Sequence, residues 1–237
     1  MRIVTWIFRI LLVVTLFMVA GLVAVLVLTN KADSDALDIL DMPHVTEENR
    51  IIILDQGYAT HNLIFYQGGL VETEAYLVLL NQLSEQGIRV FAPKMPLNLA
   101  ILGRSFVDII LEQYPSDLPW VVMGHSLGGA ALSFVVDERF DSYILLASYP
   151  AESVDLSDTS VRVLSITASL DGVLNRENFN LAKERLPLET VYMDIEGGNH
   201  AQFGHYGKQR NDNDATISRE TQQDLTVQAI LQFLDLD

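Results

Sequence analysis

The stretch "WVVMGHSLGGAAL" (residues 120–132) passes from an apolar run, through one serine, into a segment of small residues. Its first part has the continuous apolar character of a strand buried on both faces, and its last part favours a helix packed closely on a sheet. Gly124 and Gly128 flank Ser126 in the pattern G-x-S-x-G. Such a serine lies on a sharp, strained turn where larger flanking side chains would collide. The sequence therefore predicts a strand–turn–helix unit that presents the Ser126 hydroxyl.

A serine hydroxyl becomes a good nucleophile only when a histidine takes its proton and a carboxylate orients that histidine. After a turn of this kind the acid comes next in the chain and the histidine last. Only His200 and His205 follow Ser126. We expect His200 to be the base, because it comes first after an expected strand and behind two glycines. His205 is the alternative, and is otherwise a hydrogen-bonded loop residue. His125 is expected to point away from the serine hydroxyl.

Asp171 is our candidate for the carboxylate that orients the base. It comes soon after the apolar run 161–167, which places it at the carboxyl end of an expected strand, where the sites of α/β sheets gather. Asp155, Asp158 and Asp194 are the alternatives. The first two lie in a polar stretch before that strand and the third lies inside the next strand. Each of them therefore fits a solvated or structural charge better.

Two backbone N–H groups are needed to hold the oxyanion of a tetrahedral intermediate. Leu127, the residue after the serine, supplies one of them, and the second comes from the loop after an early strand. In "LIFYQGGLVE" (63–72) the paired glycines let the backbone approach a substrate. We expect Gly69 to be this second donor, with Leu70 as the alternative. The other interpretation is a glycine turn that serves packing alone.

Short apolar runs alternate with longer segments of helical period along most of the chain. This alternation predicts an α/β domain with a mostly parallel sheet and helices on both faces. The helices are bounded by Gly87, by Pro115 and by Ser218, which is a helix-capping residue. The expected strands are residues 51–54, 63–66, 88–92, 120–124, 143–147, 161–167 and 190–195, and the expected helices are residues 72–87, 103–115 and 218–237.

The beginning of the chain is almost wholly apolar. Residues 10–28 contain no charged side chain and, as a helix, span most of a hydrocarbon core. Arg2 and Arg9 precede this segment and acidic residues follow it, so the positive-inside rule places the domain outside the cytoplasm. We therefore expect one N-terminal transmembrane helix that anchors the chain in the cell membrane. The alternative is a secretory signal, cleaved near residues 34–36, which would release the domain.

Composition divides the chain into three parts. Residues 1–31 form the anchor or signal segment, residues 32–49 are polar and acidic and fit a short stalk, and residues 50–237 form the folded domain. Beyond residue 31 there are twelve Lys and Arg against thirty-one Asp and Glu. Nucleic acid is a poor partner for a surface of such charge.

No metal is expected from the sequence. The chain has no cysteine, and hence neither a disulfide nor a cysteine-bound metal. Asp212 and Asp214 are spaced as in a calcium loop, but the glycine at the sixth place and the glutamate at the twelfth place of such a loop are missing. We therefore interpret these aspartates as loop residues without an ion.

Several stretches together resemble a known family. They include "GGLVETEAY" (68–76), "GHSLGGAAL" (124–132), "LDGV" (170–173) and "GGNHAQFGHYG" (197–207). With them the chain, from about Arg50 to its last residue, resembles the α/β-hydrolase superfamily, and more closely a branch of small bacterial hydrolases related to dienelactone hydrolases.

The resemblance implies a serine hydrolase with Ser126 as nucleophile, His200 as base and Asp171 as orienting acid, working through an acyl-enzyme without a cofactor. The expected partner is a small acyl substrate with a carboxylic ester, thioester or lactone. Gln67 departs from the family, which has proline or histidine before the paired glycines. Residues 94–102 are expected to line an open pocket or to pack in the core. Two alternatives stay open: the same triad acting on an amide or cell-wall acyl bond, and a hydrolase-like surface protein without activity.

Overall fold

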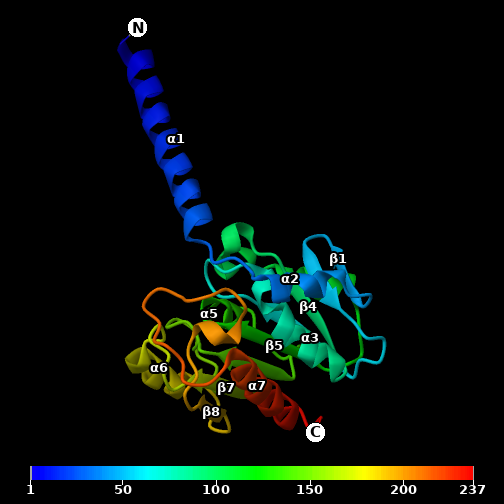
Figure 1. Cartoon of the computed structure of the whole chain (residues 1–237). Coiled ribbons are helices and arrows are strands. Elements are labelled where there is room, and N and C mark those ends of the chain that lie inside the picture. Colours follow the sequence, from blue (N-terminus) through cyan, green and yellow to red (C-terminus); the bar gives the residue numbers. More distant parts are fainter. Residues whose placement is uncertain (1, 237) are drawn as a thin grey trace.

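One eight-stranded sheet forms the centre of the fold in this computed structural model, which describes residues 2–236 (Figure 1). The strands are β1 (Val45–Glu48), β2 (Ile51–Leu54), β3 (His61–Tyr66), β4 (Ile88–Pro93), β5 (Trp120–His125), β6 (Ser142–Leu146), β7 (Arg162–Ala168) and β8 (Val191–Ile195). They lie in the order β1-β2-β4-β3-β5-β6-β7-β8. Only the pairs β1–β2 and β2–β4 are antiparallel. The seven expected strands and the mostly parallel sheet are therefore confirmed.

Helices and 3-10 turns (η) connect these strands. They are α2 (Ser34–Asp38), η1 (Ile39–Asp41), η2 (Thr73–Tyr76), α3 (Leu77–Glu85), η3 (Pro96–Asn98), η4 (Ala100–Gly103), α4 (Phe106–Gln113), α5 (Leu127–Leu132), α6 (Arg176–Ala182), η5 (Lys183–Arg185), η6 (Ala201–Phe203) and α7 (Arg219–Phe233). The three helices expected from periodicity correspond to η2 with α3, to α4 and to α7. Helix α6 has no counterpart among the helices expected from the sequence.

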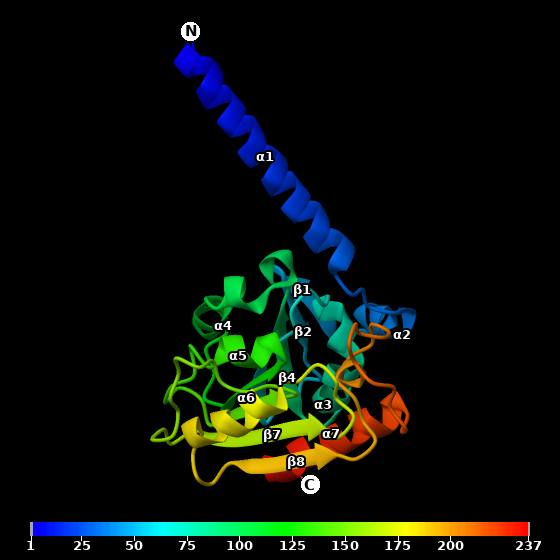
Figure 2. The same ribbon diagram turned by 90° about the vertical axis from the view of Figure 1, so that its left-hand side faces the viewer.

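Two hydrophobic cores lie on the two faces of the sheet, because successive side chains of a strand point to opposite sides. On β3, Leu63 and Phe65 join the core under α3 and α7, whereas Ile64 and Tyr66 join the core under α4 and α5. Figure 2 shows β7 and β8 with α7 on one side and α6 on the other. The predicted covering of both faces is confirmed. The arrangement leaves the carboxyl ends of β5, β7 and β8 at one edge.

Helix α1 (Arg2–Leu28) projects from this domain as a single helix (Figures 1 and 2). Many of its large apolar side chains are exposed, among them Leu11, Phe17 and Val27. The structure does not describe the side chains of residues 2–5, 7, 8, 20, 22, 24 and 26. Within what it does describe, no helix combines the length and apolarity that crossing a membrane requires. The predicted transmembrane helix is thus not confirmed.

Residues 32–49, which the sequence suggests to be a stalk, lie on the domain. The Asp33 side chain caps α2 by accepting a hydrogen bond from the Ala36 N–H at 3.2 Å. Ala36 and Ile39 are buried, and β1 pairs with β2 along its whole length. The side chains of β1 are mostly exposed, so its sequence lacks the apolar alternation by which a strand is predicted.

Candidate active site

Ser126 lies on a strained turn between β5 and α5, as the sequence predicts. Its φ of 51° and ψ of −122° fall outside the regions that residues other than glycine favour. A Cβ on Gly124 would lie 2.4 Å from the Gly129 nitrogen, and one on Gly128 would lie 2.1 Å from the Tyr66 carbonyl oxygen. Both glycines are therefore required sterically, the first for the bend itself and the second for the close approach of α5 to β3.

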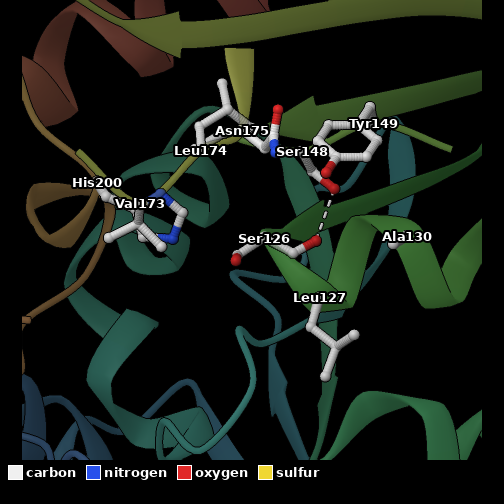
Figure 3. A pocket seen from close by; sticks show the side chains of 10 residues that line it. Ser126, Leu127, Ala130, Ser148, Tyr149, Val173, Leu174, Asn175 and His200 are labelled. Atoms are coloured by element: carbon white, nitrogen blue, oxygen red, sulfur yellow. Dashed lines mark hydrogen bonds between the residues drawn. The ribbon is translucent and has the colours of Figure 1, made fainter. Parts of the chain in front are cut away.

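The backbone of Ser126 is held from both sides. Its N–H donates to the Leu146 carbonyl oxygen at 2.9 Å, and its own carbonyl oxygen accepts a hydrogen bond from Ser148 Oγ at 2.6 Å. Figure 3 shows this second bond and the Ser126 hydroxyl directed to the other side, toward His200. The turn thus fixes where the hydroxyl points.

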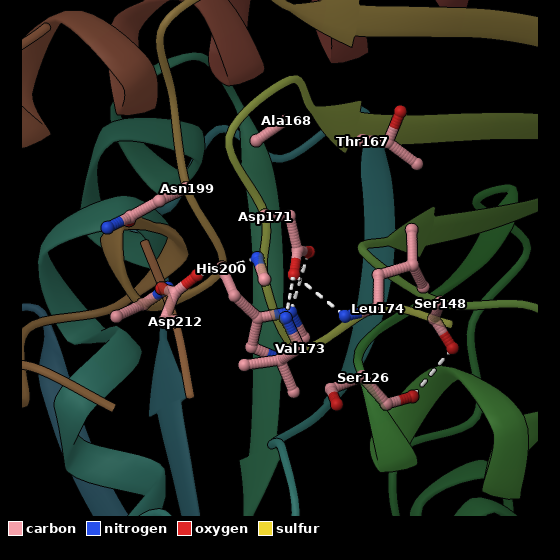
Figure 4. A network of polar contacts seen from close by, with 12 residues as sticks. Ser126, Ser148, Thr167, Ala168, Asp171, Val173, Leu174, Asn199, His200 and Asp212 are labelled. Carbon is pink, nitrogen blue, oxygen red and sulfur yellow. Dashed lines mark hydrogen bonds and ion pairs between the residues drawn. The ribbon is translucent and has the colours of Figure 1, made fainter. Parts of the chain in front are cut away.

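Asp171 and His200 come together at the carboxyl edge of the sheet, beyond β7 and β8. His200 Nδ1 lies 2.7 Å from Asp171 Oδ2, and both side chains are buried (Figure 4). Asp171 Oδ1 accepts the N–H groups of Val173 and Leu174, each at 2.8 Å. Burial alone raises the pKa of Asp171, but the hydrogen bonds from His200, Leu174 and Val173 outweigh burial and hold it below the ordinary value of 3.8. Asp171 is therefore an ionised acceptor.

This arrangement sets the tautomer of His200. An ionised carboxylate only accepts, so Nδ1 carries the hydrogen, and Nε2 is the nitrogen left to act as a base. Nε2 is buried and has no hydrogen-bond partner among the described residues. Ser126 and His200 line the same cavity of about 270 Å³, whose other walls include Leu127, Val173 and Leu174. The imidazole of His200 and the hydroxyl-bearing Ser126 thus line one pocket.

Asp212 connects the two loops that carry Asp171 and His200. It is buried; its Oδ1 accepts the Gly172 N–H at 3.0 Å, and its Oδ2 accepts the Ala201 N–H at 2.9 Å. Both hydrogen bonds go to the residue that follows a member of the pair. The sequence analysis gave Asp212 no such role, because its partners are distant in the chain. Its two oxygens hold the loops at a fixed separation.

Leu127 and Gly69, the expected oxyanion donors, are neighbours. A Cβ on Gly69 would lie 2.9 Å from Leu127 Cδ2. Within the described residues, neither backbone N–H donates to a protein acceptor. The N–H of the alternative donor, Leu70, is engaged with the Asn98 carbonyl oxygen at 2.8 Å. The geometry therefore favours Gly69 over Leu70 beside the serine.

Tyr76 connects this loop to His125, a contact that the sequence analysis missed. The Tyr76 hydroxyl accepts the Gly68 N–H at 3.1 Å and lies 2.8 Å from His125 Nδ1 (the hydroxyl hydrogen is therefore available to that nitrogen). The His125 ring lies 4.5 Å from the His200 ring, centroid to centroid. Burial and the nearby His200 lower the pKa of His125 well below 6.5, so His125 is neutral. In the sequence, the hydrogen bond between Gly68 and Tyr76 is indicated only by their spacing of eight residues.

The alternative site residues lie elsewhere. His205 is buried with Nδ1 3.1 Å from Arg219 Nη1 and 3.3 Å from Asp33 Oδ1, and it does not line the cavity. Asp194 accepts a hydrogen bond from the Thr167 hydroxyl. Asp155 accepts the N–H of Ser157 at 3.0 Å, and Asp158 is exposed. Residues 94–102, expected in the pocket wall or the core, do not line the cavity; Met95 and Ala100 of this segment are instead buried in the core.

An α/β hydrolase is defined by three features that are present here. They are the strand order of the sheet, the strained turn at Ser126, and the buried pair of Asp171 and His200. The sequence matches the Alpha/beta hydrolase family over residues 62–224, and the chain belongs to that family. No curated protein sequence matches it significantly.

Solved structures share the fold at low identity. A predicted CIB-like hydrolase from Thermoplasma acidophilum has a TM-score of 0.60 at 15% identity, with 79% of this chain and 96% of that chain covered. Dienelactone hydrolase from Anabaena variabilis has a TM-score of 0.59 at 15% identity, covering 77% and 90%. An esterase from Thermogutta terrifontis has a TM-score of 0.59 at 10% identity, covering 83% and 94%.

Proposed function

We propose that the chain is a serine hydrolase that cleaves a carboxylic ester, thioester or lactone through an acyl-enzyme. The observation that carries this proposal is the position of His200. Its Nδ1 is bound by Asp171, its Nε2 has no hydrogen-bond partner among the described residues, and His200 lines the same cavity as Ser126. Membership of the α/β hydrolase family, and structural similarity to proteins described as an esterase and a dienelactone hydrolase, support the same reaction class.

In the proposed reaction Ser126 Oγ attacks the acyl carbon while His200 Nε2 takes its proton. Asp171 stays ionised and stabilises the imidazolium that forms. The backbone N–H groups of Leu127 and Gly69 hold the oxyanion. When the tetrahedral intermediate collapses, the bond to the alcohol, thiol or lactone oxygen breaks, and His200 returns the proton to that leaving group. Water then attacks the acyl-enzyme by the same steps and restores the serine.

The test is activity and active-site labelling of the purified full chain. We expect hydrolysis of short-chain p-nitrophenyl esters and covalent labelling by a fluorophosphonate. Ser126→Ala should lose both signals, with kcat falling by about 10⁴-fold or more. Ser153→Ala, at an exposed serine, is the matched control and should keep both. A wild-type chain that neither turns over these esters nor accepts the label would rule out the proposal.

We also propose that α1 associates with a membrane and that the domain lies outside the cytoplasm. Residues 10–28 carry no charge, and the described apolar side chains of this segment are largely exposed to solvent in the isolated chain. Such a surface is stabilised by contact with hydrocarbon. We expect the full chain to sediment with membranes, to be released by detergent but not by salt, and to be reached by protease added to intact cells. A chain in the soluble fraction, or one protected from the protease, would contradict this.

A further inference from the structure

The end of α1 is joined directly to the loop of the proposed oxyanion hole. Two residues after Leu28, Asn30 donates its N–H to the Leu70 carbonyl oxygen at 2.8 Å and accepts the Glu72 N–H at 3.0 Å. Asn30 and Val71 form a parallel bridge. Two residues of extended chain span only about 7 Å. The active site therefore cannot lie far from wherever α1 ends.

Further contacts fix this junction on the domain. The Ala32 N–H donates to Glu72 Oε2 at 3.0 Å, and the Asp33 N–H donates to the His205 carbonyl oxygen at 2.9 Å. The Asp33 carboxylate also pairs with Arg219 Nη1 at 2.9 Å. Because residues 30–33 are held by three separate parts of the domain, there is no free stalk about which the domain could turn. The face beside Leu70 stays beside α1.

That face carries a set of exposed apolar side chains, which we call the apolar rim: Leu97, Ile101, Leu102, Leu127 and Phe134. The rim is continuous with the site. Asn98, next to Leu97, accepts the N–H of Leu70, and Leu127 contacts the Gly69 position and lines the cavity. Figures 1 and 2 both show the green turns of η3 and η4 at the end of the domain from which α1 emerges.

The composition of the apolar rim fits a lipid surface. Leu102 is 54% exposed and Phe134 is 41% exposed, and the Arg104 guanidinium lies 4.9 Å from the centre of the Phe134 ring. Apolar side chains with a bordering cation are typical of surfaces that enter the headgroup region of a bilayer. The rest of the domain is strongly acidic, so anionic headgroups would not attract it. Binding of the apolar rim to a membrane would therefore be driven by burial of apolar surface.

We propose that the apolar rim rests in the membrane surface beside α1 and that the substrate is an acyl ester of a membrane lipid, which enters the cavity from the bilayer. This inference rests on the proposed ester hydrolysis and narrows it to a substrate class. The ester groups of a glycerolipid lie at the boundary of headgroup and hydrocarbon, and that is the depth at which Leu127 and the cavity mouth would be held.

Membrane contact can be tested without catalysis. The chain has no cysteine, so Leu102→Cys carries a single thiol for an NBD fluorophore. Leu188→Cys, at a 98% exposed leucine near the amino end of β8, is the matched control. In phosphatidylcholine vesicles we expect the label at 102 to shift its emission to the blue and to be quenched by doxyl-labelled lipid, and the label at 188 to do neither. Equal behaviour of the two labels would overturn the contact. The contact would also be overturned if, in detergent without vesicles, the blue shift of the label at 102 depended on protein concentration. That result would indicate that a second copy of the chain covers the apolar rim.

Substrate class is tested by two activities of the same full chain in vesicles. Wild type should cleave both soluble p-nitrophenyl acetate and the phosphatidylcholine of the vesicle. The double variant Ile101→Asp with Leu102→Asp should lower lipid turnover relative to soluble ester by about tenfold or more, while Leu188→Asp leaves this ratio unchanged. A wild type that cleaves only the soluble ester, or a double variant that loses both activities equally, would overturn the lipid substrate. Failure of both substrates in wild type would instead overturn the proposed hydrolase, and the fluorophore would still decide the membrane contact.

Discussion

The two halves of the candidate site are held in different ways. On the acid–base side, Asp171 receives hydrogen bonds from His200 and from two backbone N–H groups, and Asp212 fixes both loops. On the oxyanion side, the Gly68 N–H donates to one side chain, the Tyr76 hydroxyl, and the loop beyond it is held by backbone hydrogen bonds at Leu70. Gln67 is buried there with neither amide atom hydrogen bonded among the described residues. The acid–base side is thus held by several side-chain hydrogen bonds, whereas the Gly68 end of the oxyanion loop has one. Substitutions should therefore have graded effects on the two sides.

The largest effect is expected at Gly128, where helix α5 after the serine packs against the end of β3 and the start of the oxyanion loop. A Cβ there would lie 2.1 Å from the Tyr66 carbonyl oxygen, a backbone atom of β3 that cannot rotate away. Gly128→Ala should therefore separate α5 from β3, lower the free energy of unfolding by about 3 kcal/mol or more, and abolish ester hydrolysis. Gly21→Ala, where nothing lies within 4 Å, is the control and should change neither. Chemical denaturation together with ester turnover measures both. An active Gly128→Ala variant would show that the site does not need this close approach of α5 to β3.

Loss of the acid should abolish catalysis without disturbing the oxyanion side. In Asp171→Asn the amide no longer fixes His200 with its hydrogen on Nδ1, so kcat should fall by about 10⁴-fold with little change in KM. The pKa of Asp171 lies below its ordinary 3.8, so ionised Asp171 stabilises the folded state above that pH, and this contribution disappears as the pH falls through the lowered pKa.

The same variant gives a pH test of stability. Wild type should be more stable than Asp171→Asn at neutral pH, and the difference should shrink as denaturation is repeated at values below 3.8. A difference that grows in acid would mean that the pKa of Asp171 is raised in the folded protein. The acid–base side would then not be organised around a carboxylate held in its ionised form.

The features that the sequence predicts correctly are those marked by a short pattern of neighbouring residues or by the order of residues along the chain. The strands follow from short apolar runs, and Ser126, Asp171 and His200 follow from a turn pattern and a chain order, which the structure brings to one edge of the sheet. β1 was missed because an exposed strand has no apolar alternation, and it was assigned to a stalk instead. Tyr76 and Asp212 were missed as positioning residues because they act through partners 8 to 49 residues away. Apart from the spacing of eight residues between Gly68 and Tyr76, nothing near them in the sequence marks such contacts.

A moderate effect is expected at Tyr76, the single hydroxyl of the oxyanion side. Tyr76→Phe keeps the ring in the core but leaves the buried Gly68 N–H and His125 Nδ1 without this partner. The free energy of unfolding should fall by about 1–3 kcal/mol. We expect kcat to fall by about tenfold with KM nearly unchanged, because the donors act on the transition state. Tyr66→Phe, which removes a buried hydroxyl that donates to the Gly103 carbonyl oxygen and accepts the Val107 N–H on the other face of the sheet, is the control and should leave kcat intact. Equal losses in the two variants would assign Tyr76 to packing alone.

The smallest effect is expected at Gln67, next to Gly68 on the same loop. Its side-chain oxygen and nitrogen are both buried without a hydrogen-bond partner among the described residues. An unpaired buried amide costs free energy, whereas an apolar side chain of similar shape does not. Gln67→Met should therefore leave the free energy of unfolding unchanged or raise it by up to about 1 kcal/mol, with ester turnover close to wild type. The backbone at this position is unaltered, so the approach of the Gln67 carbonyl to Gly128 remains. A loss of stability comparable to that of Tyr76→Phe would mean that the amide is satisfied, by a buried water for instance, and that the oxyanion side is held as redundantly as the acid–base side.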